Sequence, residues 1–236
     1  MATIVLCHGA WSAAWAWKRM RPRLAAGHDF YTPSYTGLGA RAHLAHPGIT
    51  LSTHIADVLG ELEAEELTDV TLLGHSYGGM VATGVATRAP EKVRRIVYLD
   101  AFVPRTNQSL FDLAPPEHRQ RMIAGAAEHG QGWQVPANPP PPDTPAEDLE
   151  WLGRRRNSMP IGCLGERLQF ETEPACPRHY IYCTRNGPGD TFRQFADRAA
   201  TEDGWTRDDL DASHSPAVTA PDALAALLQK LIPQGG

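Results

Sequence analysis

The sequence has few cysteines and no feature that would hold the chain in a membrane. Four cysteines occur among 236 residues, none in a Cys-x-x-Cys pair, and Cys7 and Cys183 lie within apolar, strand-like runs. This spacing indicates buried free thiols in a reducing compartment rather than a disulfide framework. No run of about 18 apolar residues and no cleavable apolar leader can be recognised. We therefore expect a cytoplasmic protein with no membrane partner.

Positive charge is also scarce relative to negative charge. Lys and Arg number 22 against 27 Asp and Glu, a formal net charge of −5. We expect no nucleic-acid partner, because the chain lacks the basic surface that nucleic acids attract. The acidic residues Glu61, Glu63, Glu65 and Glu66 end a helix-like segment and are typical of a solvated face rather than a metal site. The glycine-rich stretch 35–39 is not followed by Lys-Ser or Lys-Thr. No metal and no organic cofactor is therefore expected.

The sequence does contain a regular alternation of strand-like and helix-like segments. Hydrophobic residues make up 42% of the chain, which suits one globular domain with a substantial core. Short apolar runs predict strands, and apolar residues at helical spacing predict helices between them. The expected strands cover residues 3–7, 29–33, 70–73, 93–99, 179–184 and 205–210, and the expected helices 12–26, 51–66, 79–88, 190–201 and 221–232. This alternation predicts an α/β fold with a mostly parallel, doubly wound sheet.

Residues 105–178 interrupt the alternation. They contain helix-like stretches at 116–129 and 145–156, and between these a proline-rich tract with four consecutive prolines. A proline tract is extended and cannot join a central strand. We therefore expect residues 1–104 and 179–236 to form the core, and residues 105–178 to form an inserted helical cap with a proline-rich loop.

A Gly-x-Ser-x-Gly pentapeptide lies at the centre of this pattern. Gly74-His75-Ser76-Tyr77-Gly78 follows the expected strand at 70–73 and precedes the helix-like run at 79–88. Alone, the pentapeptide is a weak pattern that a glycine-rich turn with an incidental serine would also match. Between a buried strand and a helix, it predicts a serine exposed at the apex of a strained turn. Ser76 is therefore the candidate nucleophile.

A neutral serine hydroxyl needs a base within hydrogen-bond reach and an acid to orient that base. His214 is the candidate base, because it lies in the loop between the last expected strand and the terminal helix. Asp100, at the end of the strand after the serine motif, and Asp190, after the strand at 179–184, are the candidate acids. The early positions of the second loop hold Asn186 and Gly187 rather than a carboxylate, and Asp190 also suits the N-cap of the next helix. We favour Asp100 and keep Asp190 as the alternative.

Several motifs together resemble the α/β-hydrolase superfamily. They are His8-Gly9-Ala10-Trp11 with Trp15-Ala16-Trp17-Lys18, the Ser76 turn, Tyr98-Leu99-Asp100-Ala101-Phe102-Val103-Pro104, and His214 ahead of Pro221-Asp222-Ala223-Leu224. More narrowly, they resemble the branch of small bacterial esterases, plant methylesterases and hydroxynitrile lyases. The resemblance extends over nearly the whole chain but is weak over 105–178. It implies an α/β-hydrolase fold, with Ser76 as nucleophile, His214 as base and the backbone N–H groups of Ala10 and Tyr77 as the oxyanion hole.

Two positions depart from the lyases of this branch. Those enzymes carry a threonine in the oxyanion loop and a lysine directly after the catalytic histidine, whereas Gly9 and Ser215 correspond to these positions here. A cyanide-releasing step needs a cation to stabilise the leaving anion, and neither residue supplies one. The resemblance therefore favours hydrolysis over cyanide release.

The residues and the resemblance predict a serine hydrolase of the carboxylesterase or lactonase type. Its substrate would be a small aromatic or apolar ester, cleaved through an acyl-enzyme. We expect His8, His75 and Trp133 to shape the substrate pocket, with Leu110 and Phe111 as further apolar wall residues. Two alternatives stay open, a non-hydrolytic tailoring enzyme of natural-product biosynthesis and a small-molecule receptor with degenerate catalysis. We also consider a homodimer formed through the helical cap.

Overall fold

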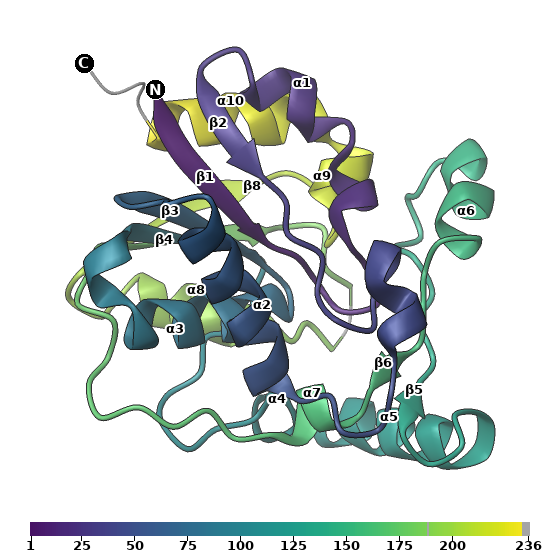
Figure 1. Cartoon of the computed structure of the whole chain (residues 1–236). Helices are drawn as coiled ribbons and strands as arrows, with labels where there is room; N and C mark the ends of the chain where they lie inside the picture. The colour runs from purple at the N-terminus through teal and green to yellow at the C-terminus, as the bar shows by residue number, and fades with distance from the viewer. Residues whose placement is uncertain (188, 233–236) are drawn as a thin grey trace.

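Six parallel strands form the central sheet of the computed structural model, which describes residues 1–187 and 189–232. Their spatial order is β2-β1-β3-β4-β7-β8 (Figure 1). The strands are β1 (Ala2–Cys7), β2 (His28–Tyr31), β3 (Val70–His75), β4 (Val93–Leu99), β7 (Arg178–Cys183) and β8 (Trp205–Leu210). Each expected strand is thus present, within a residue or two at its ends, and the parallel α/β sheet is confirmed.

Helices cover both faces of this sheet. One face packs against α2 (Leu51–Ala64), α3 (Gly78–Arg88) and α8 (Arg193–Ala199). The other packs against α1 (Met20–Leu24) and α10 (Pro221–Leu231). Side chains alternate along a strand, so Val5 joins the first core cluster while Ile4 and Leu6 join the second. The short elements are η1 (Ala14–Trp17), η2 (Gly39–Leu44), η3 (Pro90–Lys92) and α9 (Pro216–Thr219).

The prediction of a single helix over residues 12–26 is wrong. The structure divides this segment into the 3₁₀ helix η1 and the short helix α1. Pro22 lies in the first turn of α1, where its missing N–H is tolerated. A continuous helix would instead need that N–H as a donor to Lys18, so the segment restarts at Met20.

The segment between β4 and β7 adds no strand to the main sheet. It contains α4 (Leu110–Leu113), α5 (Pro116–His129), α6 (Ala146–Gly153) and α7 (Gly162–Gly165). It also contains β5 (Gln134–Val135) and β6 (Met159–Pro160), an antiparallel pair that the sequence analysis did not expect. In Figure 1, α5 and α6 lie to one side of the central sheet.

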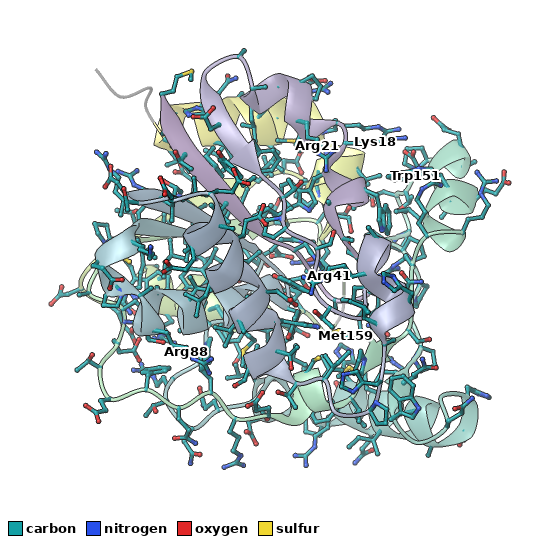
Figure 2. The ribbon with its side chains drawn as sticks, viewed as in Figure 1. Lys18, Arg21, Arg41, Arg88, Trp151 and Met159 are labelled. Carbon is teal, nitrogen blue, oxygen red and sulfur yellow. The ribbon has the colours of Figure 1, made fainter. Side chains whose placement is uncertain are left out.

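Helix α6 is fastened to the start of the chain. The Arg19 guanidinium makes two hydrogen bonds to the Asp148 carboxylate, of 2.8 and 2.9 Å. The ammonium of Lys18 lies 4.1 Å from the centre of the Trp151 ring, and Figure 2 shows these two side chains approaching one another. Trp15 packs against Trp151 edge to face, with 5.2 Å between ring centres. Trp15 thus contacts the inserted segment, whereas Trp17 is buried in the core.

None of the helices in the described ranges combines the length and apolarity that crossing a bilayer requires.

Candidate active site

Ser76 lies in the sharp turn between β3 and α3. Its φ of 55° is in the left-handed region, which few residues other than glycine adopt. The first two residues of α3, Gly78 and Gly79, lie so close to neighbouring backbone that neither position has room for a side chain. A Cβ on Gly78 would lie 1.8 Å from the Cys7 carbonyl oxygen, and one on Gly79 would lie 2.1 Å from the Phe102 carbonyl oxygen. The glycines therefore allow α3 to begin directly against β1 and hold Ser76 at the apex.

His214 lies within hydrogen-bond distance of both Ser76 and Asp100. Its Nε2 is 3.0 Å from the Ser76 Oγ, and its Nδ1 is 2.7 Å from the Asp100 Oδ2. In the neutral tautomer that fits both contacts, Nδ1–H donates to the carboxylate and Nε2 accepts from the serine hydroxyl. Phe192 stacks on the imidazole with 4.5 Å between ring centres. The arrangement can remove a proton from Ser76 while the carboxylate stabilises the resulting imidazolium.

Of the two candidate acids, Asp100 is the one that contacts His214. It is fully buried, and its Oδ1 accepts hydrogen bonds of 3.2 Å from the Cys183 N–H and from the Asn186 side-chain amide. Asp190 instead accepts bonds from the Tyr182 hydroxyl at 2.5 Å and the Phe192 N–H at 2.8 Å. Asp190 thus binds backbone just ahead of α8, but it is not the N-cap of that helix, which is Phe192.

The candidate oxyanion donors are the backbone N–H groups of Ala10 and Tyr77. Both residues line the same cavity as Ser76. In the ranges 1–187 and 189–232, neither N–H donates to another protein group. Two backbone donors left unpaired beside a nucleophile have the composition of an oxyanion hole.

The two histidines that flank the sequence motifs occupy different places. His75 lines the cavity, and burial, together with the nearby His214, lowers its pKa to about 3. Its ring is therefore neutral, and Nε2–H donates to the His214 carbonyl oxygen at 2.7 Å. His8 lies outside the cavity wall, since it is fully buried and stacked on Tyr35 with 3.8 Å between ring centres. Burial lowers the pKa of His8 to about 3 as well.

The predictions that His8 and Trp133 line the substrate pocket are wrong. Trp133 lies just before β5, and its carbonyl accepts from the Ile161 N–H at 2.7 Å, away from the cavity lining. Leu110 does line the cavity, whereas Phe111 is buried in the core and does not line it. The tryptophans at the cavity come instead from the segment after β1, where their clustering in the sequence was the available signal.

The cavity at Ser76 has a volume of about 850 Å³. Its wall is largely apolar and aromatic, with Trp11, Trp15, Trp17, Phe102, Leu110 and Phe192 among its members. Prolines 139–142 and Arg156 contribute from the inserted segment. Sequence reasoning did not identify these last residues as pocket residues.

Among the described residues, no group of three or more His, Cys, Asp or Glu side chains is arranged to bind a metal.

Comparison with known proteins agrees with this architecture. The model of the alpha/beta hydrolase family matches residues 4–227. A carbendazim hydrolyzing esterase of Nocardioides sp. (strain SG-4G) is 39% identical over 241 residues, which cover 98% of this chain and 100% of that protein. Methylesterase 1 of Arabidopsis thaliana is 33% identical over 117 residues, 44% of this chain and 41% of that protein. Among solved structures, an extracellular alpha/beta-hydrolase from a Paenibacillus species matches with a TM-score of 0.84 at 25% identity, covering 98% of each chain.

Proposed function

Because the chain belongs to the alpha/beta hydrolase family, we propose that it is a serine esterase that uses Ser76 as nucleophile, His214 as base and Asp100 as acid. The observation that carries this proposal is the continuous chain of hydrogen bonds from Asp100 through His214 to Ser76 at the wall of a large apolar cavity. A serine without a base in reach would be a poor nucleophile.

In the proposed reaction, the Ser76 Oγ attacks the ester carbonyl carbon while its proton passes to the His214 Nε2. The N–H groups of Ala10 and Tyr77 stabilise the oxyanion of the tetrahedral intermediate. When the intermediate collapses, the imidazolium returns its proton to the departing alcohol, and an acyl-enzyme remains. A water molecule, deprotonated by His214, then attacks the acyl carbon, and Ser76 is regenerated as the acid product leaves.

The cavity wall supports a small aromatic or apolar ester as the substrate class. Flat aromatic side chains such as Trp11 and Phe192 offer stacking surfaces for a ring. The similarity to a carbendazim hydrolyzing esterase over 98% of this chain makes carbendazim the first compound to test. The place of action that we propose is the cytoplasm, because the cysteines are free thiols, namely Cys7, Cys163, Cys176 and Cys183.

Steady-state hydrolysis of carbendazim and of a series of aryl methyl esters, by wild type and Ser76→Ala, tests the proposal. We expect turnover of at least one ester by wild type and a loss of about 10⁴-fold or more in kcat for Ser76→Ala. Hydrolysis that survives in Ser76→Ala would contradict the role of Ser76 as the nucleophile. Binding of these esters without turnover by wild type would favour a receptor.

A further inference from the structure

The cavity wall carries one cation close to the proposed oxyanion loop. Arg156 follows α6, and its half-buried side chain lines the cavity. Its guanidinium carbon lies 6.0 Å from the centre of the Trp11 ring. Trp11 directly follows Ala10, one of the two proposed oxyanion donors. Together with burial, which is the largest cause, the Arg156 charge lowers the pKa of His75, the residue directly before Ser76, so the guanidinium acts on the part of the cavity where the ester would react.

Arg156 has no carboxylate partner among residues 1–187 and 189–232. No Asp or Glu oxygen there lies within 4.0 Å of its guanidinium, and its Nη1 donates only to the Asn138 carbonyl oxygen, at 2.5 Å. Burial alone lowers the pKa of Arg156. Arg185 at the same cavity is the contrast, since its two bonds of 2.7 Å to Asp211 raise its pKa.

Among the charged side chains described at the cavity wall, Arg121 and Arg185 are cations, and Arg185 pairs with Asp211. The carboxylate at the wall, Asp143, is exposed and lies more than 4.0 Å from the Arg156 guanidinium. A guanidinium has five N–H donors in a planar fork, and within residues 1–187 and 189–232 the Arg156 side chain makes only one hydrogen bond. A partly desolvated cation with unused donors gains most from a carboxylate, which can accept two of its bonds at once.

We propose that Arg156 binds a free carboxylate of the substrate, so that the enzyme prefers half-esters, in which one acid group is esterified and a second is not. The inference rests on the proposed esterase function for the cleavage itself, which takes place at Ser76. The carboxylate lies against Arg156 while the ring or chain that joins the two acid groups contacts Trp11. Arg156 is thereby a specificity-determining residue.

Binding to Ser76→Ala separates this inference from hydrolysis. The ligands are monomethyl terephthalate, monomethyl isophthalate and, for each, the neutral analogue in which the free acid is a carboxamide. Calorimetry gives the ratio of the two Kd values for each matched pair. We expect Ser76→Ala to bind at least one acid about 10- to 100-fold more tightly than its carboxamide. Adding Arg156→Gln, which retains a donor for Asn138, should reduce that ratio to about 1.

Arg155→Gln is the matched control, because it removes the same charge one residue away, on an exposed side chain that packs on Trp151 rather than lining the cavity. It should leave the ratio as in Ser76→Ala. Equal affinity for acids and carboxamides in Ser76→Ala would overturn the inference. An equal loss of affinity for both ligands on adding Arg156→Gln would overturn it too, because Arg156 would then serve to hold the proline-rich loop. Turnover of the same half-esters by wild type tests the esterase proposal separately.

Discussion

At the scale of single residues, the turn that carries Ser76 depends on a missing side chain. A methyl group on Gly78 would overlap the Cys7 carbonyl of β1, at 1.8 Å. We expect Gly78→Ala to lower the free energy of unfolding by more than about 3 kcal/mol, because either strand or helix must move. Gly60→Ala in α2 is the matched control, with no heavy atom within 4 Å of the new methyl group, and should raise stability by about 0.5–1 kcal/mol.

Urea unfolding followed by circular dichroism measures both glycine variants. A Gly78→Ala protein that unfolds at the wild-type urea concentration would show that α3 does not approach β1 as described.

The three residues of the hydrogen-bonded chain could be identified from local sequence, because each follows a strand. Ser76, Asp100 and His214 belong to recognisable motifs, and the structure brings them together. The contact of Asn186 with Asp100 spans 86 positions and has no local signature. Arg156 was missed for a similar reason, since a surface arginine and a cavity arginine look alike in a sequence.

At the scale of elements, the attachment of α6 depends on a pair of charges. Asp148 is almost fully buried, with 5% of its side chain exposed, and Arg19 is its ion-pair partner. Arg19→Met would leave this carboxylate unpaired, so we expect a loss of about 3 kcal/mol in stability and faster amide exchange over residues 146–153. Arg21→Met is the control, because among the described residues the Arg21 side chain makes one exposed hydrogen bond, to the Thr32 hydroxyl at 2.8 Å, and its loss should cost less than about 0.5 kcal/mol. Equal exchange in both variants would contradict the role of the pair.

The main sheet could be read from the sequence because its strands are short, apolar and buried, and such runs have few other stable conformations. The inserted segment was harder to read. The β5–β6 pair has two residues in each strand, one of them Pro160, and forms through contacts between positions about 25 apart. Its pairing is set by packing against the core rather than by local propensity.

At the scale of the whole molecule, buried histidines make stability depend on pH. Burial lowers the pKa of His8 to about 3, that of His54 to about 4 and that of His75 to about 3. In the unfolded chain, each would titrate near about 6.5. Below that pH the unfolded state binds more protons than the folded state, so stability falls as the pH falls from about 6.5 toward 4.

Three such histidines should give a slope of about 4 kcal/mol per pH unit near pH 5.5, since each proton contributes about 1.4 kcal/mol. Urea unfolding at pH 7.5, 6.5 and 5.5 measures this slope. His54→Gln should reduce it by about one third, whereas His129→Gln, an exposed position, should leave it unchanged. A pH-independent free energy of unfolding over this range would contradict the neutral state of these rings.

The central claim is that Asp100, and not Asp190, activates Ser76 through His214. Labelling with a fluorophosphonate probe, followed by intact mass, tests it most directly on wild type, Ser76→Ala, Asp100→Asn and Asp190→Asn. We predict one adduct on wild type, none on Ser76→Ala, labelling slowed by about 10³- to 10⁴-fold in Asp100→Asn, and a nearly wild-type rate in Asp190→Asn. Labelling of Asp100→Asn at the wild-type rate, or no labelling of wild type at all, would contradict the claim.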